Sequence, residues 1–380
     1  DAIVIGDGEA VIEKIVQAWI DWQSGGQDKK QLLEKLARLQ GIYVPALYQA
    51  SFYQNEFQII RPTQPARQPV ERTVIASLDT AMFPDRPIIP FAKPVHDRLR
   101  LEVSRGCSRG CRFCQAGMIY RPVRERSIPK IIELTEKALS ATGYEDISLL
   151  SLSTGDYGCL IALLEHLMQR CAPQKTAISL PSIRAGTLTP ELMALIKQVR
   201  KTGFTIAPEA GSQRLRDVIN KNISEDQIID GVQNAFRLGW QVIKLYFMVG
   251  LPTETEEDLH AIVDLVRRLR RIKAYGRRGR HKGKINVSIT TFIPKPHTPF
   301  QWAPQLNLEE SNQKIGYLRR ALKKRGIHVK WQNPEISLLE GLLARGDRRL
   351  SRLLMTAYRK GCQFDGWSDH FRLDLWQSAF

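Results

Sequence analysis

Strand and helix signals alternate six times between residues 97 and 292, and this alternation is the strongest constraint on the fold. The expected strands are short apolar runs at 99–103, 147–152, 176–180, 204–207, 242–248 and 285–292. Helices between them begin at capping signals, which are Ser127, Thr189, the box Ser224-x-x-Gln227 and the box Thr253-x-x-Glu256. This pattern predicts parallel strands with right-handed crossovers. A partial TIM barrel of the (β/α)6 type and a doubly wound sheet both satisfy it.

Three cysteines directly after the first expected strand form a C-x3-C-x2-C array. Cys107, Cys111 and Cys114 can reach one metal centre, and with no fourth cysteine nearby one coordination position stays open. Three arginines interleave with the array and are expected to favour thiolate over thiol: Arg105, Arg109 and Arg112. The alternative is a zinc site completed by a distant histidine or by one of the other cysteines, which are Cys159, Cys171 and Cys362.

The array, with Phe113 as an apolar shield before the third cysteine, resembles the cluster loop of the radical S-adenosylmethionine (SAM) superfamily. The resemblance covers roughly residues 95–300 and implies a (β/α)6 barrel. It also implies that the three cysteines hold a [4Fe-4S] cluster whose open iron binds SAM. In that family the reduced cluster splits SAM into methionine and a 5′-deoxyadenosyl radical, which abstracts a substrate hydrogen. A reductase or a flavodoxin-type electron donor is therefore expected.

Every expected strand ends in small or polar residues, and in barrel enzymes the site lies at the carboxyl ends of the strands. The resemblance assigns roles to these ends. Thr154-Gly155-Asp156 stands at the family's Gly-Gly-Glu position and departs from that commonest form; this segment would hold the methionyl ammonium of SAM. The remaining assignments follow in chain order: Ser182 and Arg184 to the methionyl carboxylate, Glu209 and Ser212 to the ribose, and Gly250 and Pro252 to the adenine.

The segments outside the core define the expected domains. Residues 1–60 look like the last strand and helix of a Rossmann-like, cobalamin-binding-type domain whose cobalt-ligating part is not in this chain, so cobalamin is a further cofactor to consider. Residues 61–94 hold seven prolines and are read as a linker. The core is expected at 95–305 and a small α/β appendage at 306–380. The whole chain most resembles an uncharacterised branch of radical SAM proteins that carry such an N-terminal domain.

The charge of the chain is uneven. The net charge is +17, and residues 1–60 carry five Lys/Arg against eight Asp/Glu, so the other 320 residues carry +20. Ten cations and no acid lie at 267–284, and a second basic stretch lies at 319–325. Basic segments of this kind suit a phosphate backbone, which makes RNA a candidate partner. Basic residues also serve simply as solvated surface.

Six cysteines with three of them clustered fit a reducing cytoplasm better than a disulfide framework, and no apolar run approaches the 18 residues of a membrane span. The leading hypothesis is a radical SAM enzyme that modifies RNA by methylation or methylthiolation. One alternative is a radical SAM enzyme that acts on a small metabolite. Another, from a different class, is a non-catalytic iron–sulfur or zinc protein that binds nucleic acid.

Overall fold

A computed structural model of the chain describes residues 1–380 except 27, 54–56, 65–68, 93, 182, 188, 200–202 and 277–278, and the side chains of 275, 276 and 280–282. The chain divides into two compact units, Asp1–Phe83 and Pro84–Phe380. Among the described residues, no helix combines the length and the hydropathy that crossing a membrane requires.

The first unit is a small α/β body. Its elements are β1 (Ile3–Val4), α1 (Glu9–Gly25), α2 (Lys29–Leu36), β2 (Ile42–Tyr43), β3 (Tyr48–Phe52) and β4 (Gln58–Pro62). The strands form two antiparallel pairs, β1 with β2 and β3 with β4. Val11 and Ala18 of α1 pack on α2, whereas four apolar residues of the same helix are exposed: Ile12, Val16, Trp19 and Ile20. Within the proline-rich segment, Thr73 pairs with Gly6 and joins that stretch to this unit.

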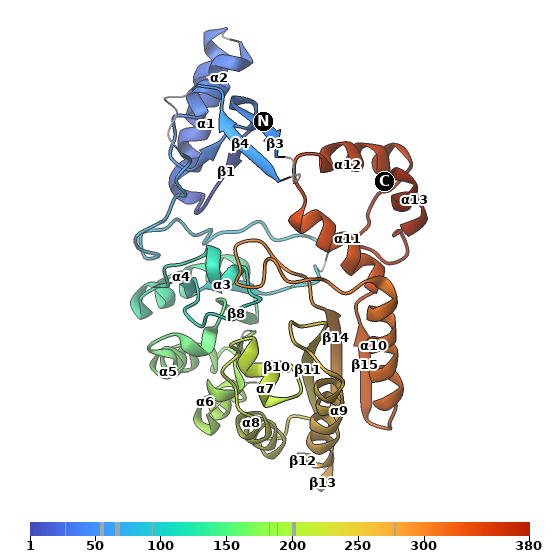
Figure 1. The fold of residues 1–380 in the computed structure, drawn as a ribbon. Coiled ribbons are helices and arrows are strands. Elements are labelled where there is room, and N and C mark those ends of the chain that lie inside the picture. Colours follow the sequence, from blue (N-terminus) through green and yellow to red (C-terminus); the bar gives the residue numbers. More distant parts are fainter. Residues whose placement is uncertain are drawn as a thin grey trace. The chain divides into compact units, whose positions relative to one another are not determined.

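Seven parallel strands form the second unit, in two sheets whose strand order follows the chain (Figure 1). The first sheet is β5 (Leu99–Glu102), β8 (Asp146–Leu150) and β9 (Ala177–Ser179). The second is β10 (Phe204–Glu209), β11 (Val242–Val249), β14 (Lys284–Thr291) and β15 (Ile327–Trp331). A doubly wound sheet would reverse its strand order at a switch point. Because no reversal occurs, the prediction of a partial barrel is confirmed.

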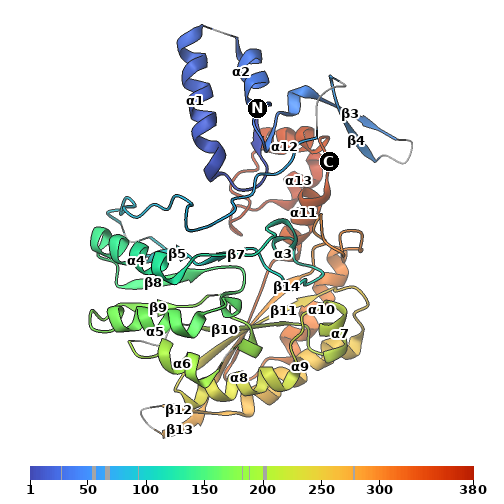
Figure 2. The same ribbon diagram turned by 90° about the vertical axis from the view of Figure 1, so that its left-hand side faces the viewer.

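The register of the strands brings the apolar residues of neighbouring strands together in the core. Ile243, Leu245 and Phe247 of β11 stand opposite Ile285, Val287 and Ile289 of β14, and all six side chains are buried. These rows face α8 (Glu225–Arg237), α9 (Glu256–Arg271) and α10 (Leu308–Ala321) in one apolar cluster. In Figure 2 the helices α8 and α9 run below β10 and β11. The side chains between the buried rows point to the other face, toward the barrel interior.

The remaining helices of the core are α3 (Ala116–Ile119), α4 (Ile128–Thr142), α5 (Leu160–Cys171), α6 (Pro190–Ile196) and α7 (Gln213–Val218). The caps at Ser127, Thr189 and Ser224 are confirmed. The predicted box Thr253-x-x-Glu256 is wrong. Helix α9 begins after Thr255, whose backbone N–H donates to Asp258 at 2.8 Å, because Thr253 is held in a turn at φ 66°.

The C-terminal segment is α/β as expected, and its strand β15 joins the core sheet beside β14. It also contains α11 (Pro334–Arg345), α12 (Leu350–Arg359) and α13 (Leu373–Ala379). The basic stretch at 267–284 forms the end of α9 and a hairpin of β12 (Lys273–Gly276) and β13 (Gly279–Lys282), two strands that sequence analysis did not identify. This hairpin lies at the end of the barrel opposite α3 (Figure 1). Arg277 and Arg278 lie outside the described residues.

Candidate cluster and SAM site

The cysteine loop follows β5 and is tied to the connection between α7 and α8. Arg112 N–H donates to the Ile219 carbonyl at 3.0 Å, and the Asn220 side chain donates to the Gly110 carbonyl at 2.9 Å. Gly106 has φ 94°, and a Cβ there would stand 2.6 Å from two backbone carbonyl oxygens. Glycine is therefore required at this turn, which starts the loop directly before its first cysteine.

The three cysteines are free thiols, with Cys111 buried and Cys107 and Cys114 half-buried. Burial raises the pKa of the Cys114 thiol, against the expected preference for thiolate. The interleaved arginines do not simply surround the sulfurs, since Arg105 forms an ion pair with Glu102 and Arg109 with Asp156. A bound metal would supply the positive charge that these thiols need in order to ionise.

Among the described residues, no group of three or more His, Cys, Asp or Glu side chains converges on a point that one metal ion could occupy. Zinc takes all its ligands at about 2.0–2.3 Å from one centre. A four-iron cluster instead places each thiolate on a different iron, so it accepts sulfurs that are further apart. The loop carries three free cysteines close together in sequence, which fits such a cluster.

Asp156 lies in a 3-10 turn, η2 (Thr154–Asp156), directly after β8. Both of its carboxylate oxygens accept hydrogen bonds from the guanidinium of Arg109, with Nε–Oδ2 at 2.7 Å. This contact joins the cysteine loop to the end of the second strand. The neighbouring Gly155 packs so closely on Thr187 that a Cβ would lie 2.1 Å from its hydroxyl oxygen. The structure therefore brings the expected ammonium contact next to the array.

Arg184 lies after β9 and faces the same loop. Its Nη1 is 3.9 Å from the Cys111 sulfur, and its Nη2 donates to the carbonyl oxygens of Lys221 and Asn222. Thus a cation from the third strand end stands beside a cysteine from the first. Ser182, the other residue expected to contact the methionyl carboxylate, lies outside the described residues.

Glu209 ends β10 with φ 68°, at a break in the pairing with β11. This left-handed conformation is uncommon for a glutamate, and residues in it concentrate at functional sites. Its Oε1 accepts from Lys221 Nζ at 3.0 Å, and neither side chain is more than 15% exposed. The same ammonium lies 5.7 Å from the ring centre of Phe113. Lys221 thus links the expected ribose contact to the residue beside Cys114.

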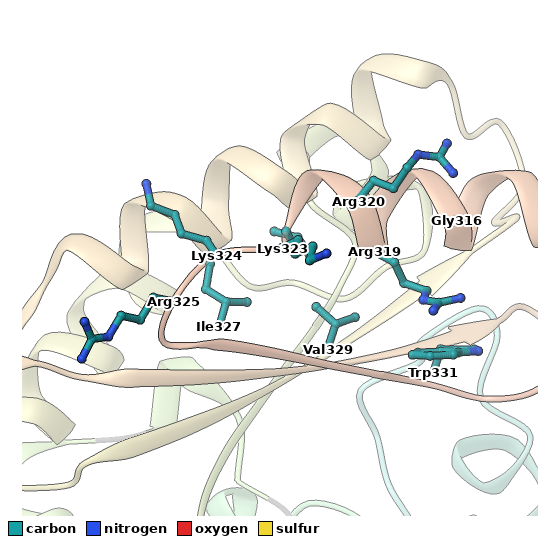
Figure 3. A pocket seen from close by; sticks show the side chains of 10 residues that line it. Gly316, Arg319, Arg320, Lys323, Lys324, Arg325, Ile327, Val329 and Trp331 are labelled. Atoms are coloured by element: carbon teal, nitrogen blue, oxygen red, sulfur yellow. The ribbon is translucent and has the colours of Figure 1, made fainter.

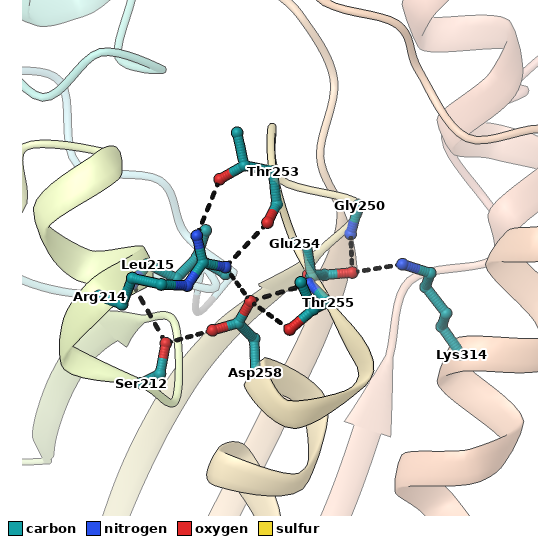
Figure 4. A network of polar contacts seen from close by, with 9 residues as sticks. All are labelled: Ser212, Arg214, Leu215, Gly250, Thr253, Glu254, Thr255, Asp258 and Lys314. Atoms are coloured by element: carbon teal, nitrogen blue, oxygen red, sulfur yellow. Dashed lines mark hydrogen bonds and ion pairs between the residues drawn. The ribbon is translucent and has the colours of Figure 1, made fainter.

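Ser212 and Gly250 belong to a polar network that joins the ends of β10 and β11 (Figure 4). The Ser212 hydroxyl donates to Asp258 and caps α7 by accepting from Leu215 N–H at 3.1 Å. Arg214 donates to the same carboxylate and to the Thr253 carbonyl, the latter at 2.8 Å. Burial alone would raise the pKa of Asp258, but the hydrogen bonds that it accepts hold it below its ordinary value.

A second carboxylate organises the turn that contains Gly250 and Pro252. Glu254, whose side chain is 2% exposed, accepts from Gly250 N–H at 2.9 Å and from Lys314 Nζ of α10 at 2.7 Å. Gly250 has φ 82°, and a Cβ there would lie 2.5 Å from the Leu306 side chain. The turn is therefore fixed by an ion pair whose carboxylate is buried, and its glycine leaves no room for a side chain.

Sequence reasoning missed two residues that organise this site, Lys221 and Arg214. It named Arg109 for its charge beside the thiols, but not for its contact with Asp156. Lys221 and Arg214 follow no strand and match no motif, so only the folded chain pairs them with Glu209 and Asp258. The other cysteines do not complete the array: Cys171 is buried in α5 with its pKa raised to about 11, Cys362 packs with Phe371 and Trp376, and Cys159 is exposed.

Two family models match the chain. The model described as "Radical SAM superfamily" matches residues 101–266, and the model described as "Radical SAM proteins, N-terminal" matches residues 1–45. The uncharacterised protein MJ0966 of Methanocaldococcus jannaschii is 39% identical over 67% of this chain and 53% of its own length. The ribosomal protein uS12 methylthiotransferase RimO of Desulfotalea psychrophila is 26% identical over 72% of this chain and 59% of its own.

The probable threonylcarbamoyladenosine tRNA methylthiotransferase of Archaeoglobus fulgidus is 27% identical over 50% of this chain and 48% of its own length. This chain therefore spans about half to three fifths of the length of these relatives. Among solved structures, the radical SAM methyltransferase TsrM of Kitasatospora setae, with cobalamin and a [4Fe-4S] cluster bound, superposes with a TM-score of 0.53 and 16% identity, over 82% of this chain and 56% of TsrM. This likeness concerns the fold. The chain thus contains a radical SAM superfamily domain at residues 101–266, and residues 1–45 match the N-terminal part of radical SAM proteins.

Proposed function

We propose that this chain is the catalytic core of an enzyme that cleaves SAM reductively, with a [4Fe-4S] cluster held by Cys107, Cys111 and Cys114. One observation carries the proposal. The loop with the three cysteines stands at the carboxyl end of β5, and residues that follow β8, β9 and β10 contact it. Asp156 binds Arg109 of the loop, and Arg184 lies beside Cys111. Lys221, the partner of Glu209, lies beside Phe113. When bound, the cluster supplies one electron to the sulfonium of SAM, which yields methionine and a 5′-deoxyadenosyl radical.

The chain's own groups suit the polar ends of SAM. Arg184, at the Cys111 sulfur, carries in-plane donors for the methionyl carboxylate. Asp156 is already paired with Arg109, but a carboxylate has about four lone-pair positions and can also accept from the methionyl ammonium. Glu209 uses Oε1 for Lys221, which leaves Oε2 for a ribose hydroxyl. Gly250 and Pro252 would border the adenine, and Phe113 would shield the cluster.

The proposed reaction after hydrogen abstraction is methylation or methylthiolation of RNA. Two of the relatives support methylthiolation by name, and one of them, a probable tRNA methylthiotransferase, also supports RNA as the substrate, whereas the other acts on a ribosomal protein. Methyl transfer through cobalamin is another form of the proposal, because the fold matches an enzyme whose structure contains cobalamin. No residue of this chain is assigned to that cofactor. The electron would come from a reductase or a flavodoxin-type protein, in a reducing cytoplasm.

The test is anaerobic reconstitution with iron and sulfide, followed by incubation with SAM and dithionite. We expect 5′-deoxyadenosine and methionine in equal amounts, and none from the Cys111→Ala variant. Stoichiometric zinc without iron in anaerobically purified protein would overturn the proposal in favour of a non-catalytic metal protein. Mass spectrometry of nucleosides from RNA incubated with the active enzyme then tests the substrate class. SAM cleavage that is stimulated by a metabolite extract and not by RNA would favour the small-metabolite alternative.

A further inference from the structure

A basic groove lies between α10 and β15, away from the cysteine loop. It has a volume of about 650 Å³. We call it the α10–β15 groove and define it by its lining residues: Gly316, Arg319, Arg320, Leu322, Lys323, Lys324, Arg325, Ile327, Val329 and Trp331. Figure 3 shows Ile327 and Val329 on β15, Arg319 and Arg320 on α10, and the other basic side chains on the connection between the two elements. Half of the lining residues are cations and none is acidic.

Three of the five cations of the groove are available to a ligand. Within the described part of the chain, Arg320, Lys323 and Lys324 form no ion pair with a carboxylate, and all three are exposed. By contrast, Lys314 on the same helix is paired with Glu254, which lies before α9. Five neighbouring cations repel one another unless an anion lies among them. An anionic ligand with several charges would relieve this repulsion.

Arg319 and Trp331 form a stacked pair at one end of the groove. The guanidinium carbon lies 3.6 Å from the ring centre of Trp331, and the indole is 43% exposed. Stacking uses the face of the guanidinium, while its five N–H donors lie in its plane and stay free to bind a phosphate. The exposed part of the indole offers a flat surface of the kind on which unpaired bases stack.

The register of the sheet relates this groove to the site. Trp331 pairs with Ile289, Ile289 with Phe247, and Phe247 with Glu209. Trp331 and Glu209 therefore stand at the same level, three strand spacings apart, which is roughly 14 Å. The groove runs along β15 from Ile327 at the far end to Trp331 near the mouth of the barrel. A chain-like ligand in the groove would be directed toward the strand ends that carry the expected SAM contacts.

We propose that the α10–β15 groove binds a single-stranded stretch of the RNA substrate. Its cations bind successive phosphates, and Trp331 stacks an unpaired base. This inference rests on the proposed function and names the surface that holds the substrate. The combination of unpaired cations with an exposed indole favours RNA over an acidic protein, which would not need a stacking surface. The apolar residues Ile327 and Val329 are recessed and half-buried, so they cannot insert into a membrane.

The test measures binding of a fluorescent single-stranded RNA oligonucleotide and of an unmodified tRNA by the reconstituted protein, across a range of salt concentrations. Each phosphate that is neutralised on a single strand adds about 0.7 to the slope of log affinity against log salt. The variant Arg320→Gln/Lys323→Gln/Lys324→Gln should lower this slope by about 2. A matched control, Arg352→Gln/Arg359→Gln/Lys360→Gln on α12 and its C-cap, removes the same charge from exposed positions elsewhere and should leave the slope nearly unchanged.

The stacking part of the proposal has a separate readout. Trp331→Ala should weaken binding of the oligonucleotide roughly ten- to hundredfold. The slope should fall by at most about 0.7, because only the phosphate contact of Arg319, which stacks on the indole, can be lost with it. Trp331→Phe keeps an aromatic surface and should recover most of the affinity. This rescue also excludes misfolding as the cause of the loss.

Two results would overturn the proposal. One is an RNA affinity and slope in the triple variant equal to those of the parent. The other is binding of phosphatidylserine vesicles, but not of RNA, that the triple variant loses. Formation of 5′-deoxyadenosine from SAM without RNA is measured in parallel on every variant. It should stay at the level of the parent. If the groove does not bind RNA, only the RNA-binding measurements fail, whereas if the proposed SAM chemistry is wrong, no 5′-deoxyadenosine forms in any variant or in the parent.

Discussion

Lys221 Nζ donates to Glu209 Oε1 across 3.0 Å, from the loop after α7 to the end of β10. The pair stands beside Phe113 and holds a carboxylate whose backbone is in the left-handed region. The carboxylate that we propose for the ribose is thus positioned by a residue twelve positions further along the chain. In the proposed SAM site, Lys221 therefore acts as a positioning residue rather than as a ligand of the cluster.

Replacing Lys221 should separate positioning from folding. Lys221→Met removes the partner of Glu209, whose carboxylate is nearly buried. We expect a loss of about 2–3 kcal/mol in the free energy of unfolding, near the lower end of the losses that follow when a buried ion pair is broken. SAM binding measured by calorimetry should weaken, while iron content stays at the level of the parent.

The double variant Glu209→Gln/Lys221→Met removes both charges and should regain most of the stability without regaining SAM affinity. Lys137→Met, which breaks an exposed pair with Glu133, serves as the control and should change little. A double variant no more stable than Lys221→Met would contradict the role of the pair.

Iron content should depend on three cysteines and no others. After anaerobic reconstitution we expect about four irons and four sulfides per chain, and replacement of Cys107, Cys111 or Cys114 by Ala should abolish them. Cys159→Ser changes an exposed cysteine outside the array and should leave the iron content and the charge-transfer absorbance intact. Retention of the full iron content in any of the three alanine variants would show that another residue completes the site.

Gly250 and Gly143 allow strain and collision to be measured separately. Both have positive φ, 82° and 67°, but a Cβ at Gly250 would collide with Leu306, whereas a Cβ at Gly143 meets nothing within 4 Å. Gly143→Ala should cost about 1 kcal/mol of stability from backbone strain alone. Gly250→Ala should cost about 2–3 kcal/mol and also weaken SAM binding, as urea unfolding and calorimetry would show. Equal losses in the two variants would remove the steric argument for glycine at this turn.

The parts of the fold that depend on local sequence patterns were predictable. Six strands with their helices and the caps at Ser127 and Ser224 follow from apolar runs and capping residues. Strand β15 was missed, although Ile327, Val329 and Trp331 alternate with polar residues as a half-buried strand does. The cap of α9 was assigned two residues early because Thr253-x-x-Glu256 and Thr255-x-x-Asp258 both fit the same pattern, and only the turn at Thr253 decides between them.

The site was predictable only in part. The cysteines and the strand ends are visible in the sequence, because they follow from spacing and from where strands stop. Their partners are not, since Arg109 meets Asp156 and Arg214 meets Asp258 across 47 and 44 residues of chain. Such contacts depend on which strand ends become neighbours in the barrel. A single sequence gives no local signal for them.

The contact between Arg109 and Asp156 should give stability a defined dependence on pH. Burial alone would raise the pKa of the Asp156 carboxyl, but the hydrogen bonds from Arg109 outweigh it and hold the pKa below its ordinary value of 3.8. A carboxylate with a lowered pKa contributes stability that is complete above its unfolded pKa and is lost as the pH falls through the folded value. The contribution of this partly exposed pair is roughly 1 kcal/mol.

We therefore expect the difference in unfolding free energy between the parent and Asp156→Asn, both free of iron, to be constant from pH 7 to about pH 5 and to shrink below about pH 4. Urea unfolding across this range measures it. Arg109→Gln should abolish most of the same pH-dependent difference, because the carboxylate then loses the donor that lowers its pKa. If parent and Asp156→Asn lost stability in parallel down to pH 3, the Asp156 carboxylate would not be held by Arg109, and the cysteine loop would have to be joined to the end of β8 by other contacts.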